Sequence, residues 1–267
     1  MQLRDRIYIL TVIAACVVGF YTLTPPKTEL PVVNPGREFF NFDPQLPDFN
    51  DYSDVKEKKA AFFEFMLPLI EQENQRIAVL REQLLKLANK TEPLNKDEQA
   101  WLLELAEHYR VVATHNAEKP LDTRWLCNQL LSRVDQVPPS LALAQAANES
   151  AWGTSRFAVE GNNLYGLWCF RKGCGLVPGD RPDEANYEVA KYYSPRQSVR
   201  RYIHNLNTHL AYQDFRAARE QQREQNQPLS GKKSVATLTR YSTRGEDYIS
   251  ELRAMIRVNR LDQYDNL

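Results

Sequence analysis

The chain has 267 residues, which is enough for one large domain with a substantial buried core. Its 34 basic and 34 acidic residues cancel to a formal net charge of zero, and no long run of one charge occurs. This balance excludes the strongly basic surface typical of a nucleic-acid-binding protein, so we expect no nucleic-acid partner.

The N-terminal residues 1–24 indicate export or membrane anchoring. Arg4 and Arg6 precede a run without charges from Ile7 to Leu23, which is typical of a signal peptide or a short membrane anchor. No A-x-A cleavage site stands out, which favours an uncleaved anchor in the inner membrane with the rest of the chain in the periplasm. The segment ending at Cys16 also resembles a lipoprotein box, so cleavage and lipidation stay open alternatives.

The four cysteines are too few for a disulfide scaffold, and their spacing matches no four-ligand zinc site. Only Cys169 and Cys174 lie close together. In an exported protein this pair would close a small loop through a disulfide, whereas in the cytosol it would stay as two thiols. Because the N-terminus indicates export, we predict the disulfide. We expect neither a metal nor another cofactor, since no metal-binding or phosphate-loop motif occurs.

Residues 25–50 hold six of the fifteen prolines and are predicted to form an extended linker. Residues 51–136 follow as a helical N-terminal region. Apolar side chains recur there at helical spacing, Pro68 is predicted to end or kink the first helix, and another helix is predicted to begin near Asn95. No cluster of histidine, cysteine or carboxylate indicates chemistry in this region.

A buried helix is predicted between Pro139 and Gly153, because the thirteen residues between them carry only five polar side chains. Glu149 lies in its last turn. The negative end of the helix dipole and removal from water both raise the pKa of such a carboxyl group. A carboxyl that stays protonated near neutral pH suits the general acid of a glycosidase. The alternative is a buried glutamate that pairs with a neighbouring arginine.

Beyond Gly153 the sequence becomes loop-like, and residues 186–194 alternate as a short strand does. We predict a small β-hairpin lobe that faces the Glu149 helix across a cleft. Helical spacing resumes from Ser198 and again around Tyr248. The expected fold class is therefore mostly α, of the α+β kind.

Two spaced motifs carry a family resemblance. The segment 147–153, ANESAWG, and the segment 161–166, GNNLYG, resemble the A-x-E-S-x-W-G and N-N-L/Y-F-G signatures of bacterial peptidoglycan glucosaminidase domains. That family includes flagellar muramidase-type hydrolases and autolysins, and the continuation 168–178 is closest to its Bax-like members. The resemblance covers roughly residues 137–259. It implies a lysozyme-like helical catalytic domain over residues 137–267, preceded by extra helices.

The resemblance also implies site residues. The second carboxylate of the family lies on the hairpin lobe, which here corresponds to Glu188, with Glu184 as the alternative. The segment 241–248 is similar to the family's Y-A-T-D-x-x-Y stretch, whose last tyrosine faces the cleft, although Arg244 and Gly245 depart from the usual pair. This makes Tyr248 a third catalytic candidate. Candidates for substrate binding are Trp152, Asn163, Tyr165 and Trp168.

The function that these residues imply is hydrolysis of the β-1,4 bond after N-acetylglucosamine in peptidoglycan glycan strands, with Glu149 as general acid. One alternative is a lytic transglycosylase, which uses a single acid and a nucleophile from the sugar itself. The other is a non-catalytic glycan-binding or scaffold protein.

Overall fold

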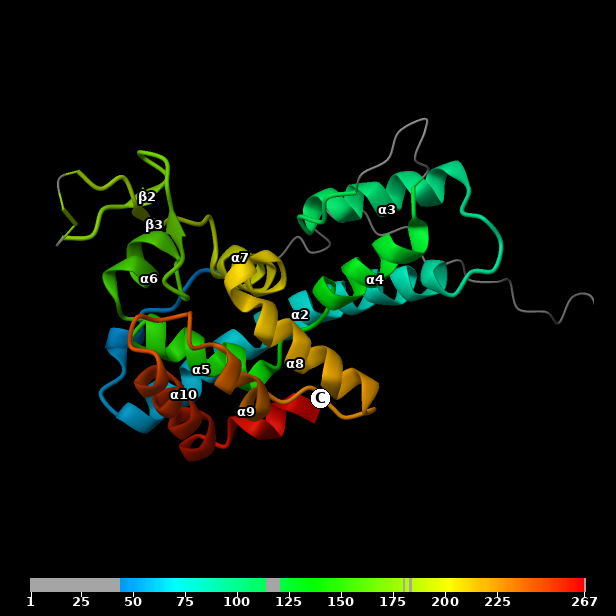
Figure 1. Ribbon diagram of the computed structural model, residues 1–267. Coiled ribbons are helices and arrows are strands. Elements are labelled where there is room, and N and C mark those ends of the chain that lie inside the picture. Colours follow the sequence, from blue (N-terminus) through cyan, green and yellow to red (C-terminus); the bar gives the residue numbers. More distant parts are fainter. Residues whose placement is uncertain (1–43, 114–120, 180, 183, 267) are drawn as a thin grey trace, which may run out of the picture. The chain divides into compact units, whose positions relative to one another are not determined.

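The computed structural model describes residues 44–113, 121–179, 181–182 and 184–266 (Figure 1). The predicted anchor over 1–24 and most of the predicted linker over 25–50 lie outside these residues. The end of the linker segment is folded, because Phe49 of the short helix η1 (Phe49–Asp51) is buried and its ring contacts those of Phe62 and Phe65. In the ranges that the structure describes, no helix combines the length and the apolar character needed to cross a membrane.

The N-terminal helical region begins with the long helix α2 (Val55–Ala88). Helices α3 (Lys96–His108) and α4 (Thr123–Arg133) follow. The side chain of Asn95 accepts from the backbone N–H of Glu98, and the Glu98 side chain accepts from that of Asn95. This capping box fixes the start of α3 where the sequence predicts it.

The sequence predicts that Pro68 ends or kinks the first helix. Pro68 lies inside α2, so the first of these alternatives is wrong. A proline in a helix interior removes one backbone hydrogen bond and costs about 3 kcal/mol or more. Met66, Leu69 and Ile70 beside it are buried. Burial of such side chains stabilises by roughly 1.5–3 kcal/mol each, which is enough to hold the helix together across the proline.

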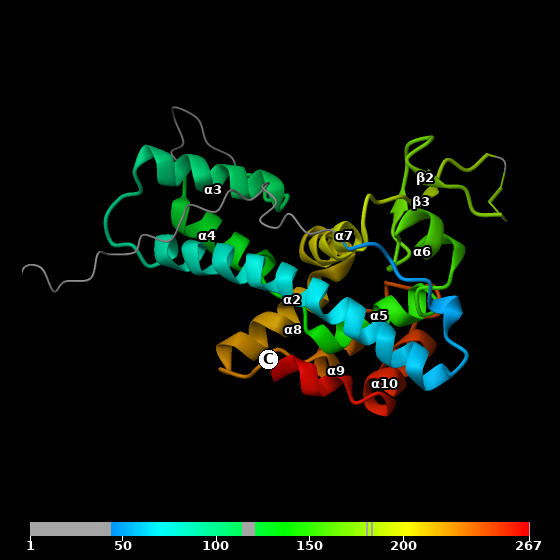
Figure 2. The ribbon, with the colours of Figure 1, turned by 180° about the vertical axis from the view of Figure 1, so that it is seen from behind.

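Helix α5 (Pro139–Glu149) is the centre of the packing. It contacts α2, α10 (Glu246–Val258), α9 (Gly231–Ser234) and the C-terminal η4 (Leu261–Asn266), and these segments surround it in Figures 1 and 2. Every side chain from Ser140 to Ala147 is buried. The surrounding elements are completed by α6 (Arg156–Gly161), α7 (Pro195–Thr208), η2 (Leu210–Tyr212), α8 (Gln213–Glu224) and η3 (Val235–Thr237).

The predicted hairpin lobe is a small three-stranded antiparallel sheet. Its strands are β1 (Trp168–Cys169), β2 (Gly175–Leu176) and β3 (Glu188–Ala190), in the order β1-β3-β2. In the register, Cys169 faces Glu188 and Gly175 faces Ala190. A disulfide joins Cys169 to Cys174 at the turn between the two edge strands. The described chain is thus mostly helical with a small sheet.

The close approach of α9 to α5 generates a stability prediction. A Cβ added at Gly231 would clash with the Oγ of Ser140 and lie 2.7 Å from the backbone N of Leu141. We expect Gly231→Ala to lower the free energy of unfolding by about 1–3 kcal/mol, because the two helices must move apart. Urea unfolding measures this change. Gly179→Ala is the control, since no described atom lies within 4 Å of its added Cβ, and an equal effect in both variants contradicts the prediction.

Candidate active site

Glu149 is the last residue of α5, so the helix ends three residues before Trp152, the last residue of the predicted helix. Ala151, Trp152 and Gly153 have positive φ angles of 50°, 60° and 79°, which a right-handed helix does not contain. The tight turn directs the chain away from the helix axis just after Glu149. The carboxyl group of Glu149 therefore lies at the end of the helix and is itself partly buried.

The environment of Glu149 favours its protonated form. Burial is the main cause that raises the pKa of this carboxyl above its ordinary value. Hydrogen bonds from the side chains of Tyr248 and Asn148 oppose the rise, and the nearby positive charge of Arg244 opposes it further. The net direction is upward, which is the direction that a general acid working near neutral pH requires.

A chain of hydrogen bonds orients Tyr248 toward this carboxyl. The hydroxyl of Tyr202 donates to the Oε1 of Gln145 at 2.7 Å, and the Nε2 of Gln145 donates to the hydroxyl oxygen of Tyr248 at 2.8 Å. Because the Tyr248 oxygen already accepts from Gln145, its single hydrogen is free to bond with Glu149. The structure thus brings together the two predicted residues Glu149 and Tyr248 from α5 and α10.

Tyr241 packs against this series of hydrogen-bonded side chains. Its ring lies parallel to that of Tyr248 with centroids 5.8 Å apart, and its hydroxyl donates to the backbone oxygen of Tyr165 at 2.9 Å. Tyr165 itself is buried and stacks on Tyr202, with ring centroids 3.8 Å apart. These four tyrosines form one packed group beside Glu149.

Gly166 lies directly against the candidate acid. A Cβ added there would be 3.3 Å from the Oε2 of Glu149, and the residue has a φ of 64° that favours glycine. The loop before it is held by Asn163, whose Nδ2 donates to the backbone oxygens of Leu167 and Ala190, each at 2.8 Å. Asn163 is buried, and its side chain binds the loop and β3.

Trp152 is directed away from this group. Its ring packs against the rings of Phe62 and Phe63 on α2, with centroid distances of 5.8 and 5.2 Å, and the Nζ of Lys59 lies 4.7 Å from its ring centroid. The tryptophan therefore ties the turn after α5 to α2.

Glu188 binds backbone groups of the disulfide loop. Its two carboxylate oxygens accept from the N–H groups of Gly173 at 2.9 Å and Gly175 at 2.8 Å, which lowers the pKa of the carboxyl. A Glu188 oxygen and the sulfurs of Cys169 and Cys174 lie within 4.8 Å of one another. Because both sulfurs belong to the disulfide, this group of atoms offers no thiolate to a metal ion.

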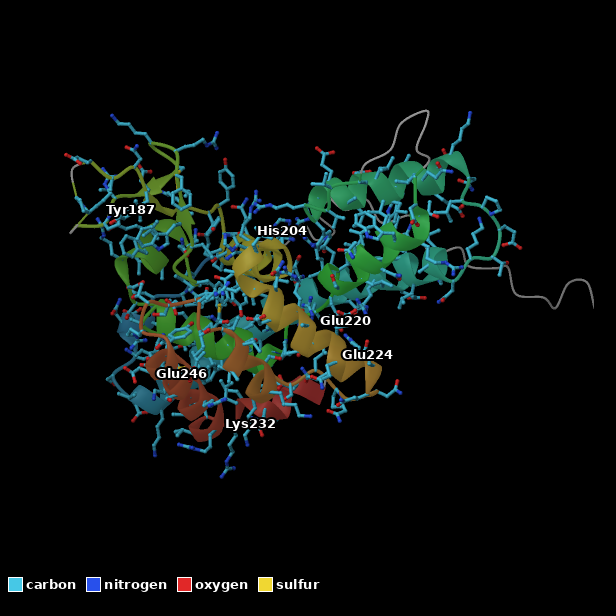
Figure 3. The ribbon with its side chains drawn as sticks, viewed as in Figure 1. Tyr187, His204, Glu220, Glu224, Lys232 and Glu246 are labelled. Carbon is cyan, nitrogen blue, oxygen red and sulfur yellow. A yellow bond between two sulfur atoms is a disulfide. The ribbon has the colours of Figure 1, made fainter. Side chains whose placement is uncertain are left out.

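A cavity of about 350 Å³ opens beside Gly166. Two of the predicted substrate-binding residues line it: Tyr165, and Trp168 of β1, whose side chain is about half exposed. The ring of Trp168 leans on that of Tyr187, with centroids 4.2 Å apart (Figure 3 labels Tyr187). A half-exposed indole at the rim of a cavity provides a flat apolar face for a sugar ring.

Sequence reasoning missed Gln145, Tyr202 and Tyr241. Gln145 precedes Glu149 by four residues and therefore shares its helix face, and it is a rare polar side chain in an alanine- and leucine-rich helix. This spacing could have identified Gln145 from the sequence. Tyr202 gives no comparable signal, because its spacing is that of an ordinary apolar position on α7.

Comparisons with known proteins agree with the resemblance. The family model described as glucosaminidase, mannosyl-glycoprotein endo-beta-N-acetylglucosaminidase, matches residues 127–261. The chain belongs to the glucosaminidase family. Within this family it is similar to the protein bax of Escherichia coli strain K12, with 35% identity over 214 residues that cover 80% of this chain and 74% of the relative.

A solved structure shows a weaker likeness. The crystal structure of the catalytic domain of the autolysin Auto from Listeria monocytogenes has 21% sequence identity to this chain and a TM-score of 0.37. The match covers 65% of this chain and 90% of the solved one.

The Tyr248 contact generates a prediction on the titration of Glu149. Tyr248→Phe removes a hydrogen bond that stabilises the ionised carboxylate, so the pKa of Glu149 is expected to rise further above its ordinary value. An NMR titration of ¹³C-labelled glutamate carboxyls measures the change. Tyr193→Phe is the matched control, because Tyr193 is 90% exposed. If the pKa of Glu149 stays the same or falls in Tyr248→Phe, Tyr248 does not donate a hydrogen bond to the Glu149 carboxylate.

Proposed function

We propose that this protein is a peptidoglycan hydrolase that cleaves the β-1,4 bond after N-acetylglucosamine, with Glu149 as the general acid. The observation that carries the proposal is the Glu149 carboxyl at the end of a buried helix, beside a cavity rimmed by Trp168. Burial raises the pKa of this carboxyl, and the hydroxyl of Tyr248 is hydrogen-bonded to it. The glucosaminidase family membership supports a glycosidase, and the name of the Listeria relative describes that protein as an autolysin.

In the proposed first step, Glu149 donates its proton to the glycosidic oxygen as the bond from that oxygen to C1 of N-acetylglucosamine breaks. The leaving sugar takes the proton, and positive charge develops at C1 and the ring oxygen. Glu149 is left as a carboxylate, which the Tyr248 hydroxyl stabilises through its hydrogen bond. The same carboxylate then accepts a proton from the water that attacks C1, which restores the acid.

Glycosidases of this type commonly use a second carboxylate near C1, for which Glu188 and Glu184 are the candidates. Glu188 is only 3% exposed, and its two oxygens accept from the loop N–H groups of Gly173 and Gly175, so this arrangement directs its carboxylate at the loop and does not present it to a sugar. We propose that the N-acetyl oxygen of the substrate stabilises C1 instead, as in substrate-assisted glycosidases, and that Glu188 holds the lobe in position. Glu184 is exposed and binds no described group that would orient it.

The same engagement of Glu188 favours a second candidate, the lytic transglycosylase, because that reaction needs a single acid. Digestion of peptidoglycan by the purified full chain, followed by mass spectrometry, separates the two. A reducing N-acetylglucosamine end supports the hydrolase, and an anhydro-muramyl end supports the transglycosylase. Binding without turnover would leave a glycan-binding or scaffold protein and would overturn both.

The proposed substrate requires a chain that reaches the cell wall. We propose that residues 1–24 anchor the protein in the inner membrane and that the catalytic domain faces the periplasm. The Cys169–Cys174 disulfide supports this placement, since disulfides persist in oxidising compartments.

Replacing the proposed acid is the direct test of the chemistry. Glu149→Gln keeps the shape and polarity of the side chain but removes the acidic proton, so turnover of peptidoglycan is expected to fall by about two orders of magnitude or more. The thermal midpoint of unfolding should stay close to that of the parent. Glu184→Gln is the matched control and should be nearly silent. A folded Glu149→Gln protein that digests peptidoglycan at close to the parent rate would falsify the assignment.

Glu188→Gln separates a positioning role from a catalytic one. The introduced amide places an N–H group opposite a backbone N–H, so we expect a lower thermal midpoint and a weakened hold on the disulfide loop. Turnover should fall by less than about tenfold, well short of the loss in Glu149→Gln. A kcat loss as large as that of Glu149→Gln, at an unchanged thermal midpoint, would instead identify Glu188 as the second catalytic carboxylate.

A further inference from the structure

The cavity beside Gly166 has a strongly basic wall. Its lining includes Trp168 of the lobe and four basic residues: Arg110, just after α3, and Arg201, His204 and His209, on or just after α7. Figure 3 labels His204 on α7. Among the described residues, no aspartate or glutamate lines this cavity. The wall therefore presents positive charge to whatever enters.

The two arginines of this wall carry no ion pair with a carboxylate of the described residues. In the described ranges, no aspartate or glutamate forms a salt bridge with Arg110 or Arg201, and both side chains are exposed. Their charges act on the same group, since both lower the pKa of His204 below its ordinary value, after burial as the main cause. Two unpaired guanidinium groups near one histidine form a local site of positive potential.

This basic wall is continuous with the candidate acid. Gly166 lines the cavity and lies against the Oε2 of Glu149, as described above. Tyr212 and Tyr241 also line it, and the negative charge of Glu149 acts on the pKa of both hydroxyls. A glycan strand that places its scissile bond at Glu149 would therefore lay a neighbouring sugar in the cavity.

Arg110 comes from outside the family match. The glucosaminidase model covers residues 127–261, whereas Arg110 lies at the end of α3 in the N-terminal helical region. Its position is fixed from the other side, because the guanidinium of Arg133 donates to the backbone oxygens of Tyr109 and Arg110 at 2.9 and 3.1 Å. The N-terminal helices thus contribute a charged side chain to the cavity from a backbone position that these hydrogen bonds hold.

We propose that Arg110 and Arg201 bind a carboxylate of the substrate strand beside Glu149, so that the enzyme selects acidic glycans over neutral ones. This inference rests on the proposed peptidoglycan substrate. Two sources in that substrate share the chemistry: the carboxylates of the peptide stem where a stem is attached, and the lactyl carboxylate of muramic acid where no stem occupies it in an amide bond. A guanidinium binds a carboxylate through paired, charge-assisted hydrogen bonds, which a neutral N-acetylglucosamine oligomer does not offer.

The test measures binding in the full-length Glu149→Gln background, so that it does not depend on turnover. Three probes are compared: stem-bearing glycan strands, strands whose stems an amidase has removed to leave the lactyl carboxylate, and neutral N-acetylglucosamine oligomers of matched length. Arg110→Gln and Arg201→Gln are combined in one variant. Arg253→Gln, an exposed arginine on α10 that does not line the cavity, is the matched charge control.

The expected result is a loss of about ten- to hundredfold in affinity for stem-bearing strands in the double variant, with a change of less than about twofold for neutral oligomers. Arg253→Gln should match the background protein on all probes. If the loss also occurs on amidase-treated strands, the arginines bind the lactyl carboxylate that the amidase frees, and if it occurs only on stem-bearing strands, the carboxylates of the stem are the ligand.

Equal losses on acidic strands and neutral oligomers, or no loss on acidic strands, would overturn the proposal. Thermal unfolding of the double variant shows whether an equal loss comes from damage to the fold. Turnover by the parent chain is measured separately. A parent that binds acidic strands through the arginines but cleaves none of them would reject the proposed hydrolase and keep the carboxylate site.

Discussion

The burial of α5 is the constraint on which the site depends. A helix whose side chains from Ser140 to Ala147 are all buried is held on every side, by α2, α9, α10 and η4, and its last residue has little freedom to move. Glu149 occupies that last position. The same burial removes water from its carboxyl and raises the pKa of that carboxyl. One packing arrangement therefore fixes the position of the carboxyl and favours its protonated form.

Hydrogen bonds from polar side chains hold the lobe in position, as burial holds α5. Asn163 and Glu188 each bind two backbone groups of the loops and strands that form the lobe. A buried polar side chain that loses such a partner is left unsatisfied, at a cost that discourages the loop from moving. In the lobe that carries Trp168, these hydrogen bonds and the Cys169–Cys174 disulfide add to the burial of β3, which is how a three-stranded sheet of such short strands keeps its place.

Local signals and non-local packing account for what sequence reasoning predicted and what it missed. The start of α3 at Asn95 was predictable because a capping box involves residues only three apart. The end of α5 at Glu149 was not, because the positive φ angles of Ala151 and Trp152 accompany contacts with distant residues: Trp152 packs on Phe62, and the space at Gly153 is filled by Phe49. The continuity of α2 through Pro68 has the same origin, in burial that periodicity alone does not weigh.

The sequence by itself determined the mostly helical class, the Glu149 helix and, through its spaced motifs, the family to which the chain belongs. These follow from patterns within short segments, where spacing along the chain equals spacing in space. Only the tertiary structure decided which partners Glu149 has. Gln145, Tyr202 and Tyr248 form one chain of hydrogen bonds across three helices, and Arg110 and Arg201 line one cavity although 91 positions separate them. Contacts between residues so far apart in the sequence depend on how the helices pack, and no local sequence pattern encodes them.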